Sequence, residues 1–134
     1  MLLSQACAFL GDQQRAGTLY QLLQPYSETN GQLGYAAACS GATARYLGLL
    51  ATTMDQWEAA RAHFESALEM NARIVAKPYV AHTQHEYAGM LLRQGLPEDH
   101  DAAIDLLQRA LVTGQQLGMK SLLDRANTIK FAVT

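Results

Sequence analysis

The chain has 134 residues, of which 49% are hydrophobic and 16% charged, and its formal net charge is −2. This length suits one domain with its own core. The small negative charge argues against direct binding of nucleic acid or of an anionic membrane surface. No apolar run approaches the roughly 20 residues that cross a bilayer, and the opening MLLSQACAFLG lacks the basic region of a signal peptide. We therefore expect a cytoplasmic protein.

Apolar periodicity and helix-end signals predict seven helices and no strand. The first helix covers residues 2–10 and ends at Gly11. Asp12 is expected to cap the second helix, which ends near Pro25 because proline interrupts a helix. The stretch SETNGQLG that follows is expected to form the longest loop.

A long helix is predicted from about Tyr35 to Thr53, because apolar residues recur there at spacings of three and four. Asp55 is expected to cap the next helix, which continues to about Ile74. Pro78 then breaks the chain. The two cysteines of the chain stand far apart without a CxxC pair, which is typical of buried, reduced thiols.

The last three helices follow short turns. One covers residues 79–94, and the next begins at Asp99 or Asp101, whose side chains are expected to cap it. Gly118 ends that helix in the position that a terminal glycine usually takes. Residues 119–131 form the final helix, with an apolar face turned inward.

Three segments of the chain resemble one another. Ala16, Ala60 and Ala103 occupy equivalent positions, 44 and then 43 residues apart. A fixed period in this range is the signature of a helical solenoid, in which each hairpin buries its apolar face on its neighbours. We therefore predict an all-α, right-handed superhelical solenoid in a single domain, residues 1–134. Its parts are hairpins at about 1–25, 35–75 and 79–117 and a capping helix at about 119–131.

Small residues recur where two helices of a hairpin must approach closely. They are Ser4, Gly48 and Ala88 in the first helix of each pair, Gly11 and Gly95 at the turn, and Ala60, Ala67, Ala103 and Ala110 in the second helix. This pattern resembles the tetratricopeptide repeat (TPR). The chain departs from it at Asp55, which replaces the turn glycine, at Leu23, which replaces an alanine, and in a period longer than the usual 34 residues.

Several sequence strings point to a particular subgroup of these repeat proteins, and the likeness covers roughly residues 5–127. They are LYQLLQPY, YLGLLA, HFESALEMNAR, YAGMLL and AIDLLQRAL. They are similar to the C-terminal repeat region of large bacterial signalling ATPases, including transcription regulators of the LuxR and MalT type. The resemblance implies a region that senses an effector or partner and restrains an adjoining nucleotide-binding module. No GxxxxGK[ST] string occurs, so ATP binding does not carry over and no cofactor is expected.

The residues support no catalytic assignment. The serines have no GxSxG context, and neither cysteine has a histidine at a recognisable spacing. His82 and Glu86 stand one helical turn apart and could join His63 or His100 in a metal site, but the motif is not HExxH. We regard this cluster as a solvated face and predict neither a metal site nor an enzyme.

The resemblance implies that the first helix of each hairpin lines a concave groove. Mapping by repeat position places there, beside Gln5, Phe9 and Gly89, the candidate binding residues Arg45, Leu49, Thr52, His82, His85, Glu86 and Arg93. Such a mildly basic groove with apolar patches suits an extended peptide or a small acidic ligand. The leading prediction is a non-catalytic protein-interaction and regulatory module. The alternative is a receptor for a small-molecule effector bound near Arg45, His85 and Arg93.

The first helix is shorter than its counterparts, which predicts uncovered apolar surface near Leu2, Leu3 and Phe9. A solenoid usually needs a polar cap at its end. We therefore expect either homodimerisation through residues 1–25 or contact with a preceding part of a larger protein.

Overall fold

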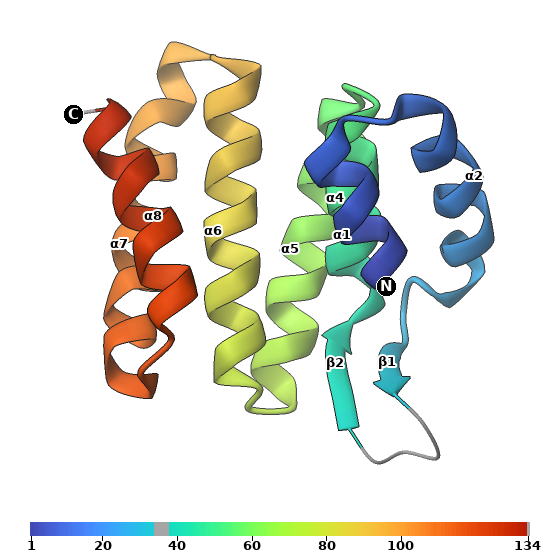
Figure 1. Cartoon of the computed structure of the whole chain (residues 1–134), viewed down its shortest axis with the longest axis horizontal. Helices are drawn as coiled ribbons and strands as arrows, with labels where there is room; N and C mark the ends of the chain where they lie inside the picture. The colour runs from blue at the N-terminus through green and yellow to red at the C-terminus, as the bar shows by residue number, and fades with distance from the viewer. Residues whose placement is uncertain (34–37, 134) are drawn as a thin grey trace.

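The computed structural model describes residues 1–33 and 38–133. In these ranges the chain is mostly helical, with seven α-helices and one pair of short antiparallel strands (Figure 1). The helices are α1 (Leu2–Leu10), α2 (Gln13–Leu23), α4 (Thr43–Thr53), α5 (Trp57–Arg73), α6 (Lys77–Gln94), α7 (His100–Leu117) and α8 (Lys120–Val133). The strands are β1 (Asn30–Leu33) and β2 (Ala38–Ala42), and the short 3-10 helices η1 (Gln24–Tyr26) and η2 (Pro97–Asp99) complete the set.

Successive helices pack against one another from one end of the molecule to the other (Figure 1). The helices α1, α4, α6 and α8 also contact in series, each touching the next of this set. The helices α2, α5 and α7 alternate with them along the chain. This serial contact brings residues from four separate segments of the sequence onto one side of the molecule.

Most of the small residues that the sequence pattern singles out are buried. Ser4, Ala60, Ala67, Ala88, Ala103 and Ala110 are all fully buried. At Gly48 the approach is closest, because a Cβ atom added there would stand 2.8 Å from Cε1 of Phe64. Phe64 itself is fully buried and stacks on Tyr87, with ring centroids 5.6 Å apart. The core of the chain therefore depends on short side chains on one helix and aromatic ones on the next.

Several predicted helix ends are confirmed. The first helix covers residues 2–10, and Gly11, Gly95 and Gly118 each end a helix in the left-handed conformation. Asp12 caps α2, since its carboxylate accepts a hydrogen bond of 3.0 Å from the backbone N–H of Arg15. These are the local signals that a sequence carries most directly.

Three predicted caps are wrong. Asp55 has a positive φ of 57° and precedes the N-cap of α5, and its carboxylate instead accepts hydrogen bonds from Gln13 and Arg93. Asp99 stands at the N-cap of α7 without a capping side-chain bond, because its carboxylate pairs with Arg61 at 2.6 Å. Asp101 lies inside the first turn of α7. In the first two cases an ion pair or hydrogen bond to another helix replaces the local cap.

The predicted helix from Tyr35 to Thr53 is wrong in its first part, and so is the expectation of no strand. Residues 38–42 form β2, which pairs with β1 inside the segment expected to be a loop, and the helix begins only at Thr43. Residues 35–37 lie outside the described residues.

Tertiary contacts explain this difference. Gly41 has a φ of +79°, and a Cβ atom there would stand 2.7 Å from the ring of Tyr79, so the chain turns where that ring packs. The N–H of Ala42 donates to Oδ1 of Asn71, which is fully buried in α5, over 2.9 Å. A helix through Ala42 would direct this N–H to its own backbone instead.

Candidate binding groove

A cavity of about 400 Å³ lies on the side formed by α1, α4, α6 and α8. Helix α1 supplies Gln5, Ala8 and Phe9, and each of the other three helices supplies one residue. These are Leu49 of α4, Glu86 of α6 and Arg125 of α8. The cavity therefore exists only because four segments far apart in the sequence pack in series.

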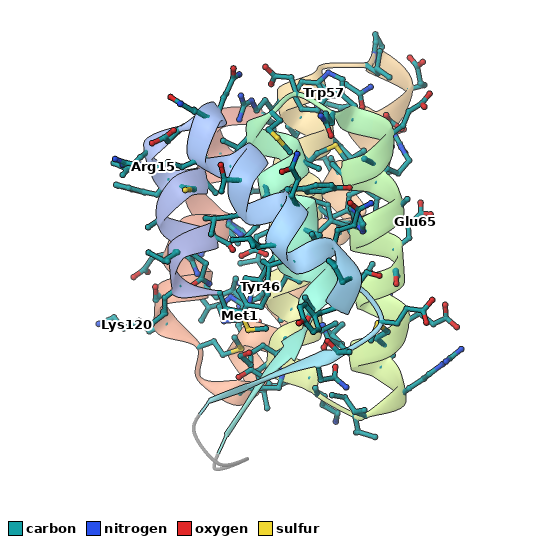
Figure 2. The ribbon with its side chains drawn as sticks, turned by 90° about the vertical axis from the view of Figure 1, so that its right-hand side faces the viewer. Met1, Arg15, Tyr46, Trp57, Glu65 and Lys120 are labelled. Carbon is teal, nitrogen blue, oxygen red and sulfur yellow. The ribbon has the colours of Figure 1, made fainter. Side chains whose placement is uncertain are left out.

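A second cavity of about 210 Å³ adjoins the first, since Gln5 lines both. Its other lining residues come from the chain start, from β2 and from α4 and α6: Met1, Leu2, Ser40, Arg45, Tyr46, Tyr79 and His82. Figure 2 shows Met1 next to Tyr46. We call the two cavities together the groove. It runs along α1 and places apolar, amide, aromatic and charged groups within reach of one ligand.

A buried ion pair lies beneath the groove. Nε and Nη2 of Arg45 donate to the two carboxylate oxygens of Glu86, over 2.6 and 2.5 Å. The side chains of Arg45 and Glu86 are only 3% and 10% exposed. Burial alone would lower the pKa of Arg45, but the charge and hydrogen bonds of Glu86 outweigh it and the pKa is raised. The pair therefore joins α4 to α6 with both charges balanced.

Two histidines on α6 lie beside this ion pair. Burial, with the positive charges of Arg45 and Arg125 and with His85, lowers the pKa of His82 to about 4. Burial, with the charges of Arg125 and Arg45, likewise lowers the pKa of His85 to about 4. Both imidazoles are therefore neutral at neutral pH. Among the described residues, Nδ1 of His82 and both ring nitrogens of His85 have no hydrogen-bond partner.

Four of the seven groove residues predicted from the sequence line the two cavities, and a fifth, His85, does not. Leu49 and Glu86 line the first cavity, and Arg45 and His82 line the second. His85 is 8% exposed and lies close enough to Arg45 and Arg125 for their charges to shift its pKa.

The other two predicted residues do not line the groove. The hydroxyl of Thr52 donates to the backbone carbonyl of Gly48 within α4. Arg93 pairs with Asp55 at 2.9 Å, and its guanidinium lies 5.8 Å from the ring centroid of Trp57. These two contacts engage the Arg93 side chain near the turn between α4 and α5.

Arg125 lines the first cavity but is not among the groove residues predicted from the sequence. The buried face of α8 contains Leu122 and Ala126. Arg125 lies three residues after one and directly before the other, so it borders that face in a helix of 3.6 residues per turn. That spacing is the signal that could have identified it.

The apolar residues proposed for self-association are all exposed, but they do not form one face. Leu2, Leu3 and Phe9 are 76%, 68% and 90% exposed. Phe9 and Leu2 line the groove, whereas Leu3 lines a separate cavity between α1 and α2 of about 220 Å³. Homodimerisation through this end stays a prediction.

The histidines weighed as metal ligands have other contacts. His63 shares a hydrogen bond of 2.7 Å with the hydroxyl of Tyr20, and burial lowers its pKa. His100 lies 3.8 Å from a carboxylate oxygen of Asp101. In the described part of the chain, no group of three His, Cys, Asp or Glu side chains is arranged to hold a metal ion. Nor does any described helix have the length and hydrophobicity needed to cross a membrane.

Comparisons with known protein families, with curated proteins and with solved structures find no match to this chain.

Proposed function

We propose that this chain is a non-catalytic protein-interaction module that binds an extended peptide segment of a partner in the groove. The observation that carries the proposal is the groove itself, lined by residues of α1, α4, α6 and α8. Clefts between packed helices are common binding sites for peptides and ligands. An elongated space along α1 suits an extended chain better than a compact ligand.

The same proposal includes a specific repeat architecture and a specific biological role. The helical hairpins form a TPR-like solenoid, and the module serves as the sensor or scaffold segment of a cytoplasmic bacterial transcription regulator or signalling ATPase. Two observations support this reading: the burial of small residues at the helix crossings and the serial contact of alternate helices. The sequence strings quoted above support the bacterial context.

Selection from a library of random linear peptides displayed on phage tests the proposal. The structure offers a matched pair of variants for it at Gly89 of α6, where an added Cβ atom meets nothing within 4 Å. Gly89 follows Glu86 by three residues and lies on the same side of the helix. A Gly89→Gln side chain should extend over the groove and abolish binding of the selected peptides, whereas Gly89→Ala should retain it. Failure to select any peptide, or equal binding to both variants, contradicts the proposal.

The alternative function is a receptor for a small-molecule effector. The feature that favours it is the second cavity, where a guanidinium, two tyrosines and a histidine surround a space of about 210 Å³. A screen of metabolites by thermal unfolding distinguishes the two functions. A metabolite at 100 times its dissociation constant should add about 2.7 kcal/mol to the free energy of unfolding. A peptide-binding module should show no such shift with any metabolite.

A further inference from the structure

Not every charge along the groove is offset by an opposite one. Both oxygens of Glu86 accept hydrogen bonds from Arg45, so these two opposite charges offset each other. Arg125, on α8, forms no ion pair with any carboxylate in residues 1–33 and 38–133. The only side-chain hydrogen bond of Arg125 in that part of the chain joins Nε to the backbone carbonyl of Ser121, over 3.3 Å. The charge left available to a ligand in the first cavity is therefore the guanidinium of Arg125.

His85 of α6 lies close enough to Arg125 for that positive charge to affect it. His85 is more than nine-tenths buried, and neither of its ring nitrogens has a partner among the described residues. After burial, the charge of Arg125 is the next largest cause that lowers the pKa of His85. Burial disfavours a charge of either sign, but the part of this shift that comes from Arg125 reflects a positive potential that attracts an anion.

The wall next to this charge is apolar. Phe9 is 90% exposed, and Ala8 and Leu49 line the same cavity. Because the Phe9 ring is exposed, an apolar side chain that covers it removes apolar surface from water and gains free energy. The lining of the first cavity thus includes a cation on α8 and an aromatic ring on α1.

We infer that the groove selects peptide segments in which an acidic side chain lies beside a large apolar one, and that Arg125 is the residue that recognises the acidic group. This inference rests on the proposed peptide-binding function. A guanidinium binds a carboxylate through two parallel hydrogen bonds, which sets both charge and orientation. The apolar neighbour in the peptide packs on Phe9 and Leu49. Arg125 acts by direct contact with the ligand, whereas Arg45 and Glu86 hold the floor of the groove.

The test compares the sequences of phage-selected peptides and their affinities for two variants. We expect selected peptides to share an Asp or Glu next to Phe, Leu, Ile or Met. Arg125→Gln should weaken binding of a labelled selected peptide at least about tenfold, since a charged hydrogen bond contributes that much. Arg109→Gln is the matched control, because Arg109 is exposed on α7 and, among the residues that the structure describes, forms an ion pair only with Asp105 of its own helix. It should leave the affinity unchanged.

A charge exchange makes the test independent of any loss of stability. Arg125→Glu should reject the acidic peptide and bind the same peptide with Lys in place of its acidic residue. Selected peptides without an acidic residue, or equal affinity of Arg125→Gln and the wild type, would overturn the inference while the peptide-binding function stands. Failure to select any peptide would overturn the proposed function and this inference with it.

Discussion

Arg45 of α4 and Glu86 of α6 form a two-point ion pair, with N–O distances of 2.6 and 2.5 Å, beneath the groove. The sequence places these residues 41 positions apart, and only the packing of α4 on α6 brings them together. Both side chains are buried, so the loss of either one leaves the other as an unpaired charge that water can hardly reach.

Arg45→Ala should therefore lower the free energy of unfolding by about 3–5 kcal/mol, the usual effect of breaking a buried pair. The double change Arg45→Met with Glu86→Leu should recover most of that loss, since it removes both charges and keeps the volume. Urea unfolding of the two variants and the wild type measures both effects. A double variant as unstable as Arg45→Ala alone would show that the ion pair is not the cause.

Stability should also depend on pH through His82 and His85. Their pKa values in the folded protein are about 4, below the ordinary 6.5, so the unfolded chain takes up protons first as the pH falls. The stabilising effect of the neutral imidazoles is therefore complete above about pH 6.5 and is lost as the pH falls towards about 4. For His85 the loss at about pH 5 should be about 2 kcal/mol.

Urea unfolding at a series of pH values measures this dependence. His85→Gln should flatten the curve between about pH 6.5 and 4, because glutamine does not titrate. The control is His100→Gln, at an exposed position on α7, which should change the slope less than His85→Gln does. Identical slopes for His85→Gln and the wild type would contradict the assignment.

Two glycines in neighbouring helices should respond oppositely to alanine. At Gly48 of α4 the new Cβ atom would stand 2.8 Å from the ring of buried Phe64, so Gly48→Ala should cost about 1–3 kcal/mol. At Gly89 of α6 no atom lies within 4 Å, so Gly89→Ala should stabilise the helix by about 0.5–1 kcal/mol. Thermal unfolding of the two variants checks the sign of each change, and a shift in the same direction for both would show that the helix spacing is different.

Asn71 should hold the strand pair on the helices. Its Oδ1 accepts from the N–H of Ala42, and its Nδ2 donates to the hydroxyl of Thr83 over 3.4 Å, all without access to solvent. Asn71→Ala leaves the buried N–H of Ala42 unpaired and should cost about 1–3 kcal/mol. Hydrogen exchange of the Ala42 amide should become much faster in this variant, while exchange at the α7 amides changes little. Unchanged protection at Ala42 would refute the role of Asn71.

The sequence predicts most of the helical framework, because its signals there are local. Gly11, Gly95 and Gly118 end helices by adopting backbone angles that few other residues take, and alanine periodicity marks the helix crossings. The segment before Thr43 has an equally helical pattern but forms β2, because Asn71 and Tyr79 contact it from distant helices. Tertiary contacts of this kind override the intrinsic helix propensity of a segment.

In the groove, too, features that follow from local sequence patterns could be predicted, whereas features that depend on tertiary contacts could not. Repeat position predicts Leu49, His82 and Glu86 on the groove side, and these residues line the two cavities because they follow the helical period of α4 and α6. Repeat position cannot show that Arg45 forms an ion pair with Glu86 or that Arg93 forms one with Asp55. Those outcomes depend on side chains whose mutual distances are set only when the helices pack.

The most direct test of the peptide-binding account is a titration of isotope-labelled protein with a selected peptide, followed by NMR through the backbone amide resonances. The account predicts that the largest shifts fall on residues that line the first cavity, namely Gln5, Ala8, Phe9, Leu49, Glu86 and Arg125. Shifts confined to the exposed sides of α2, α5 and α7, or no shift at any peptide concentration, would contradict it.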